Sequence, residues 1–265
     1  MMELNDLGLL DDADIDLVEA GITLALADRP AADPARLRRL ISGWAIALQR
    51  DTTPVSGHGR AQRLTGLIAS ETGLTGATED YDDPLNADLI ALVERGRGLP
   101  VALSILYVAL ARRVGWRADA LNLPGHVIVE VHGGVDSALI DPFDHGMGIS
   151  RERAAEIARH GGGDPLPSRF EPLTNRQLLV RLITNQASRA RSGGDTARAL
   201  RLYERMTLIA PRLTSLWWER ARLEQLLGHN QAARASLTAM LETTHEAALT
   251  RRIQAALAAL ARSNS

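Results

Sequence analysis

Cysteine and lysine are both absent from this sequence of 265 residues. Without cysteine, the chain forms no disulfide, offers no thiolate to a metal ion and has no cysteine nucleophile. Without lysine, all 30 basic residues are arginine, and no side-chain amine is available for acylation or Schiff-base chemistry. Covalent chemistry based on a thiol or an amine of the chain is therefore excluded.

Long apolar runs and a strong net charge are missing as well. The longest apolar stretch, Leu99–Ala111, is too short to cross a bilayer and suits a buried helix. Glu3 and Asp6 lie among the first ten residues, where a secretory leader would be apolar or basic. The net charge of -2 disfavours a uniformly basic nucleic-acid binder. We therefore expect a cytoplasmic protein that binds neither membrane nor nucleic acid.

The charge is divided unevenly along the chain. Residues 176–265 contain 14 arginines and six acidic residues, whereas residues 1–175 contain 16 arginines and 26 acidic residues. Such a division indicates two modules, with attraction between them or towards an acidic partner.

Helical periodicity dominates the first hundred residues. Asp11-Asp12 and Asp33-Pro34 are predicted helix starts, and Asn86 is predicted to cap a short helix that ends at Gly96. Residues 73–80 are predicted to form a loop.

An apolar helix over residues 99–114 is followed by alternating, β-branched segments that predict three strands. These are residues 117–123, 126–132 and 138–143. A further helix begins at Ser150, and residues 161–165 are predicted to form a loop or linker. A helix followed by an antiparallel sheet predicts an α+β fold.

From Thr174 onward only helical patterns remain, and they repeat. Aligning Gly194 with Gly228 gives a period of 34 residues and pairs Ala199 with Ala233. This period, with a small residue in the second helix, is typical of tetratricopeptide repeats. Because two repeats and a final helix are fewer than a free-standing solenoid needs, we expect the tail to pack on the preceding domain.

Three positions in the middle of the chain have the residue types and places of a catalytic site. Pro100 heads the apolar helix, His126 opens a strand and Asp141 lies on the next strand. Antiparallel pairing places His126 beside Asp141, the arrangement that orients an imidazole in a catalytic triad. A nucleophile at the helix N-terminus would complete the site, because the helix dipole favours a thiolate there.

Four motifs resemble the SirB-type transglutaminase-like proteins, which have a transglutaminase-like core and a tetratricopeptide-type C-terminal region. The motifs are Tyr81-Asp-Asp-Pro-Leu-Asn86, Glu94-Arg-Gly-Arg-Gly-Leu-Pro-Val101, Leu123-Pro-Gly-His126 and Leu139-Ile-Asp-Pro-Phe143. The resemblance implies a helical segment over residues 1–78, a papain-like core of one helix and an antiparallel sheet over residues 79–165, and helical repeats over residues 174–265.

The resemblance also implies roles for individual residues. Active members of the wider superfamily have a cysteine at the head of the central helix, a histidine at a strand start and an aspartate before a proline. His126 matches the histidine and Asp141 the aspartate, whereas Pro100 falls on the cysteine. A pyrrolidine ring cannot attack a carbonyl, and proline favours the first turn of a helix. The predicted site is therefore degenerate.

Ser104 is the alternative nucleophile, because it lies four residues after Pro100 on the same helix face. A serine with a His-Asp pair is a known catalytic arrangement. The opposing interpretation is that Ser104 is a small residue in helix-sheet packing, since serine nucleophiles usually occupy an exposed, strained turn.

Binding residues are predicted at three further places. His126, Glu130 and His132 share a strand face and could hold zinc or iron, but their spacing is not distinctive, so no metal is expected. Arg97 could bind an anion near a helix start, or be a solvated surface charge. Trp218 could anchor a peptide, or pack against the central domain.

We therefore expect a cytoplasmic, non-catalytic transglutaminase-like protein that binds a protein partner, of acidic character, or a ligand, and that uses no cofactor. A regulatory role fits this expectation. Two alternatives stay open: a hydrolase or acyltransferase using Ser104, His126 and Asp141, and a purely structural scaffold in which the His-Asp pair only joins two strands.

Overall fold

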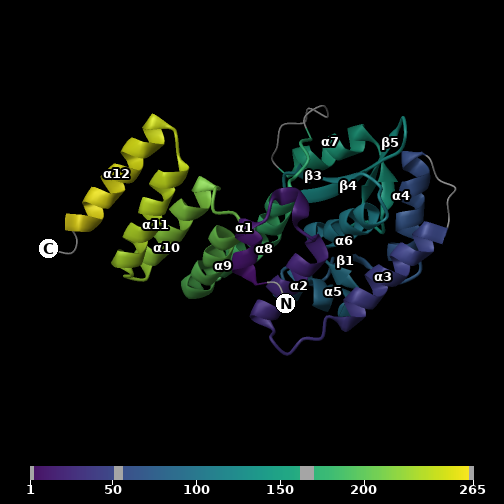
Figure 1. Cartoon of the computed structure of the whole chain (residues 1–265), viewed down its shortest axis with the longest axis horizontal. Coiled ribbons are helices and arrows are strands. Elements are labelled where there is room, and N and C mark those ends of the chain that lie inside the picture. The colour runs from purple at the N-terminus through teal and green to yellow at the C-terminus, as the bar shows by residue number, and fades with distance from the viewer. Residues whose placement is uncertain (1–2, 51–55, 162–169, 263–265) are drawn as a thin grey trace. The chain divides into compact units, whose positions relative to one another are not determined.

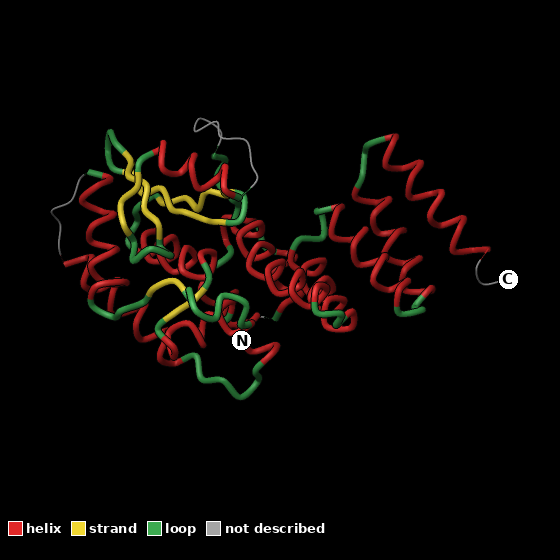
Figure 2. Tube along the Cα trace, turned by 180° about the vertical axis from the view of Figure 1, so that it is seen from behind, coloured by secondary structure: helices red, strands yellow, loops and turns green. Residues whose placement is uncertain are grey.

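The computed structural model describes residues 3–50, 56–161 and 170–262 (Figures 1 and 2). Most of the predicted linker over residues 161–165 lies outside these ranges. The chain divides into two compact units, one formed by residues 11–182 and the other by residues 3–10 and 183–265. The predicted boundaries 1–78, 79–165 and 174–265 stay a prediction.

Helices form the first part of the chain. They are α1 (Leu4–Leu9), η1 (Asp12–Asp14), α2 (Leu17–Asp28), α3 (Ala35–Arg50), α4 (Gly57–Thr65) and the π-helical turn η2 (Gly66–Ser70). Helix α2 begins later than the sequence predicts, because the Asp16 carboxylate accepts the amides of Val18 and Glu19. Such a hydrogen bond stabilises a helix start, and the structure gives it to Asp16 and not to Asp11 or Asp12.

The structure differs from two predictions in the segment before the central helix. Residues 73–80 contain a short strand, β1 (Thr75–Gly76), which pairs in parallel with β2 (Arg97–Gly98). Asn86 lies fully buried in η3 (Pro84–Ala87), and Asp88 caps α5 (Leu89–Arg95) by accepting two backbone amides. The prediction that Asn86 caps this helix is therefore wrong.

The central helix α6 (Pro100–Arg113) is followed by a four-stranded antiparallel sheet. Its strands are β3 (Ala118–Leu123), β4 (His126–His132), β5 (Ser137–Asp141) and β6 (Met147–Ile149), in that order across the sheet. Helix α7 (Arg151–His160) begins at Ser150, whose side chain accepts the Arg153 amide. The predicted α+β fold is confirmed.

Two helices cover opposite faces of this sheet (Figure 1). Leu121, Ile128 and Leu139 form one apolar cluster with α7. Side chains alternate between the two faces along a strand, so Val127 and Val129, which flank Ile128, point to the other face, which α6 covers. Helix α6 is apolar nearly all round because it is buried nearly all round.

The second unit contains the predicted helical repeat. Its helices are α9 (Thr196–Ile209), α10 (Thr214–Leu226), α11 (Asn230–Thr243) and α12 (Ala247–Arg262), together with α1 and the second half of α8 (Asn175–Ser192). Helices α9 and α11 are offset by 34 residues at both ends. Gly194 and Gly228 both have positive φ, 78° and 74°, which glycine adopts without steric cost. The predicted period is confirmed.

Candidate functional site

His126 and Asp141 meet across the sheet, as the sequence predicts. The Nε2 atom of His126 lies 2.9 Å from both carboxylate oxygens of Asp141. Because an ionised carboxylate only accepts hydrogen bonds, Nε2 carries the proton. The other ring nitrogen, Nδ1, has no hydrogen-bond partner among the described residues, and the imidazole side chain is 16% exposed. The pair therefore has one ring nitrogen without a hydrogen-bond partner among the described residues.

Asp141 is fixed from both sides of its own turn. Its Oδ1 accepts the amide of Phe143 at 3.0 Å, and its backbone carbonyl accepts the amide of Gly146 at 2.9 Å. The Phe143 ring stands edge-on to the His126 ring, with the centroids 5.8 Å apart. Such contacts hold the imidazole in one orientation before any ligand arrives.

Strand β1 connects this pair to the head of α6. The amide of Ala77 donates to the carbonyl of Gly98, two residues before Pro100, and the amide of Gly76 donates to the carbonyl of Phe143. The β1 segment is thus hydrogen-bonded both to the chain just before α6 and to Phe143, whose ring stands edge-on to His126.

Pro100 occupies the first position of α6, directly after the N-cap residue Leu99. Further along the helix, Ser104 lies against Val127, and the Nε of Arg112 donates to the carbonyl of Ala118. Ala118 is the strand partner of Val131, so α6 and β4 run in the same direction. The first turn of α6 is therefore level with the start of β4, where His126 lies.

Ser104 is fully buried, and its hydroxyl donates to the backbone carbonyl of Val127 at 3.4 Å. Among the described residues this is the hydrogen bond that the side chain makes, and none joins it to His126. Its position matches a small residue in helix-sheet packing, although the bond is to the strand and not to its own helix.

Tyr107 is a member of this region that the sequence interpretation missed. It lies on the same face of α6 as Pro100 and Ser104, since 100, 104 and 107 follow the helical spacing. The pKa of the Tyr107 phenol is raised to about 12, chiefly by burial and to a smaller extent by the negative charge of Asp141, while the contact with the Thr65 hydroxyl lowers it.

The predicted metal ligands do not converge. His132 pairs with Asp119 at 3.0 Å, whereas Glu130 accepts from Ser137 at 2.6 Å and from Arg151 at 3.0 Å. In the ranges that the structure describes, no three acidic or histidine side chains come close enough to hold a metal ion.

Arg97 and Trp218 are both engaged within the chain. Arg97 pairs with Asp80 at 2.9 Å. Trp218 is half-buried beside the apolar cluster formed by α10, α11 and α12, and the guanidinium of Arg252 lies 4.2 Å from its ring centroid. Neither side chain projects alone into solvent, so any partner would meet it together with its neighbour.

Comparison with known families gives two matches. Residues 35–184 match the transglutaminase-like superfamily, and residues 187–258 match the tetratricopeptide repeat. Together the two matches indicate a function in protein interaction. Over the described ranges, no helix combines the length and the apolar character that a membrane crossing requires.

Individual proteins resemble the chain to different extents. A UPF0162 protein of Xylella fastidiosa (strain 9a5c) is 26% identical over 257 residues, which are 93% of this chain and 92% of that protein. F-box only protein 21 of Homo sapiens is 24% identical over 133 residues, 48% of this chain and 21% of that protein. A crystal structure of menin aligns with a TM-score of 0.40 and 12% identity over 89% of this chain and 68% of menin.

Proposed function

The chain belongs to the transglutaminase-like superfamily, and from this premise we propose that it is a non-catalytic member of the SirB type that acts by binding a protein partner. The His126-Asp141 pair is the remnant of a catalytic site, and the tetratricopeptide tail is the main binding element. A regulatory role and a cytoplasmic location complete the proposal.

One observation carries the non-catalytic part of the proposal. Pro100 stands at the first position of α6, at the level of the His126-Asp141 pair. An enzyme with this layout would need a nucleophile there, because the first turn of a helix stabilises a thiolate. Proline supplies neither a nucleophilic atom nor an amide hydrogen. His126 and Asp141 are thus oriented as in an enzyme, but there is no nucleophile at Pro100 for the imidazole to activate.

The charge of the tail supports an acidic partner. Residues 176–265 contain 14 arginines against six acidic residues. Within the tail unit, Arg191 and Arg222 both bind Glu219, at 3.2 and 3.0 Å, so two guanidinium groups surround a single carboxylate. An acidic segment of a partner would find surplus positive charge at this place.

Activity measurements test the non-catalytic part. We expect the purified chain to show no hydrolase or acyltransferase turnover and no labelling of Ser104 by a fluorophosphonate probe, because the hydroxyl is buried and bound to Val127. Turnover that disappears in both His126→Ala and Ser104→Ala would contradict the proposal and support the serine enzyme.

Binding of a fluorescent glutamate-rich peptide, followed by anisotropy, tests the acidic partner. We expect binding that weakens with salt and that falls about tenfold or more in the double variant Arg191→Glu, Arg222→Glu. The control is Arg117→Glu, an exposed arginine directly before β3. Equal losses in both variants, or no binding by the parent chain, would contradict the acidic-partner proposal.

The scaffold alternative makes a different prediction for the core. If His126 and Asp141 only join two strands, His126→Ala lowers the free energy of unfolding and leaves the affinity for any partner or ligand unchanged. If they form a binding site, the same substitution weakens that affinity, and Asp141→Asn weakens it less because the amide still contacts the ring.

A further inference from the structure

A cavity of about 190 Å³ lies in the unit formed by residues 11–182, between the start of α2 and the last turn of α6. Ile15, Leu17 and Val18 supply apolar lining from the first segment, and Ala109 supplies it from α6. The cavity is smaller than a typical ligand pocket, so only a small molecule would fit, and its lining combines apolar side chains with a few polar groups as such sites do.

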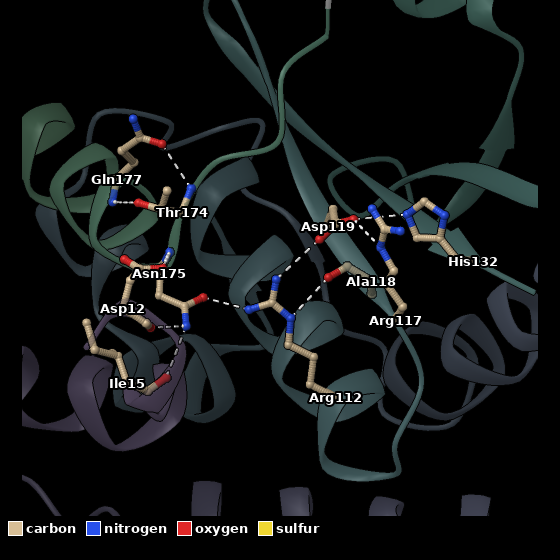
Figure 3. Close-up of polar contacts among 10 residues, drawn as sticks. All are labelled: Asp12, Ile15, Arg112, Arg117, Ala118, Asp119, His132, Thr174, Asn175 and Gln177. Carbon is tan, nitrogen blue, oxygen red and sulfur yellow. Dashed lines mark hydrogen bonds and ion pairs between the residues drawn. The ribbon is translucent and has the colours of Figure 1, made fainter. Parts of the chain in front are cut away.

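One wall of the cavity is polar and held by hydrogen bonds. The guanidinium of Arg112 donates to the Asn175 side-chain oxygen at 2.6 Å, to the Ala118 carbonyl at 3.1 Å and to Asp119 at 3.4 Å. The Asn175 amide nitrogen donates in turn to the backbone of Asp12 and Ile15 (Figure 3). These hydrogen bonds hold the Arg112 and Asn175 side chains in place at this wall, and each Nη of Arg112 retains a second N–H beyond the bonds given.

Asp16 and Arg113, which also line the cavity, form a long ion pair. The Nη2 of Arg113 lies 4.0 Å from the Oδ2 of Asp16, too far for a hydrogen bond, and both side chains are nearly half exposed. The other oxygen of Asp16 caps α2 by accepting the Val18 and Glu19 amides. Among the described residues, Arg113 makes no hydrogen bond, so Arg113 and Asp16 form an ion pair that no hydrogen bond closes.

Glu19 is the nearest further carboxylate. It is held by Arg38 through two hydrogen bonds, and the pKa of its carboxyl is lowered mainly by Arg38 and less by the charge of Arg113. Asp12 accepts the Asn175 and Arg176 amides at the start of α8. The Asp16 and Arg113 charges cancel, so a ligand with a single net charge would leave one of them uncompensated.

We propose that this cavity binds a small zwitterion with an apolar side chain, that is, a free α-amino acid. Its carboxylate binds the Arg113 guanidinium, its ammonium binds the Asp16 carboxylate, and its side chain lies on Ile15, Leu17 and Ala109. Charge-assisted hydrogen bonds of both signs then replace the open ion pair. The site is independent of His126 and of the tail.

Isothermal titration calorimetry of the full chain with three compounds tests this assignment. L-leucine carries both charges, N-acetyl-L-leucine lacks the ammonium and L-leucinamide lacks the carboxylate. We expect leucine to bind and each derivative to bind about tenfold more weakly or worse, since each loses one charged hydrogen bond. No heat with leucine, or equal binding of a derivative, would overturn the proposal.

Two substitutions and a control assign the binding to these residues. Asp16→Asn removes the charge but retains a good N-cap for α2, and Arg113→Gln removes the guanidinium. We expect each to weaken leucine binding about tenfold or more, with an unchanged circular dichroism spectrum. Arg117→Gln, outside the cavity, should leave the affinity unchanged. Leucine binding that survives both cavity substitutions would place the ligand elsewhere.

Discussion

Each unit contains one buried carboxylate that is bound on both oxygens. The two differ in whether their hydrogen-bond partner has a further partner of its own. In the tail, Glu224 is 1% exposed and receives a hydrogen bond on each oxygen, from Arg220 at 2.9 Å and from Ser236 at 2.7 Å. Arg220 is itself bound to Thr207 and lies over the ring of Trp217.

In the core, Asp141 is also buried and bound on both oxygens, but its partner differs. Arg220 donates one further hydrogen bond, to Thr207, whereas one ring nitrogen of His126 has no hydrogen-bond partner among the described residues. The tail network is closed and serves stability. The core pair remains open on one side, which is what a binding site or a former catalytic site requires.

The largest expected effect lies in the closed network. Glu224→Ala leaves the Arg220 charge half-buried without its anion, and we expect a loss of about 3 kcal/mol in the free energy of unfolding. Urea unfolding followed by circular dichroism measures this. Glu219→Ala, one turn away on the surface of α10, is the matched control and should cost at most about 1 kcal/mol. Equal losses would mean that the Glu224 network is not special.

The next effect concerns the phenol beside Asp141. The pKa of Tyr107 is raised to about 12 in the folded chain, against about 10 in an unfolded chain. The neutral phenol therefore stabilises the fold fully below pH 10, and this contribution is lost as the pH rises towards 12. Between these limits the parent should lose about 2 kcal/mol more stability than Tyr107→Phe.

Alkaline titration of the tyrosinate absorbance checks this prediction directly. The chain has three tyrosines and no lysine, so few groups titrate in this range. We expect Tyr107→Phe to remove the component with a pKa of about 12. Loss of an early component instead would show that the phenol is not buried.

A smaller effect is expected in the open pair. His126→Ala removes a hydrogen bond to a charged group, but Asp141 keeps the Phe143 amide, so we expect a loss of about 1–2 kcal/mol in unfolding free energy. The control is His58→Ala, whose exposed ring lies 3.5 Å from Asp136 and should contribute less than about 0.5 kcal/mol. A loss above that for Glu224→Ala would make the core pair the stronger structural element.

Features encoded locally were predictable from the sequence. Proline at the start of an apolar helix, β-branched alternation and glycines 34 residues apart each depend on a few neighbouring residues, and the structure has α6, β4 and the repeat in those places. The meeting of His126 with Asp141 also followed, because antiparallel neighbours bring such positions together.

Features that depend on tertiary contacts were not predictable. Strand β1 has only two residues and exists because Gly98 and Phe143 supply its partners. Asn86 and Asp88 are both good N-cap residues, and only the three-dimensional position of η3 decides between them. Tyr107 could have been found from its helical spacing with Pro100 and Ser104, but its nearness to Asp141 could not.

The central claim is that Pro100 occupies the place of a nucleophile, and the variant Pro100→Cys tests it most directly. Because the chain contains no cysteine, the new thiol is the sole one and its ionisation can be followed by thiolate absorbance. We expect its pKa to fall from about 8.5 to about 7 or below, and to return upward in Pro100→Cys, His126→Ala. Val135→Cys, in a fully exposed loop, gives the ordinary value. A Pro100→Cys thiol that titrates like the Val135→Cys thiol, with or without His126, would contradict the account.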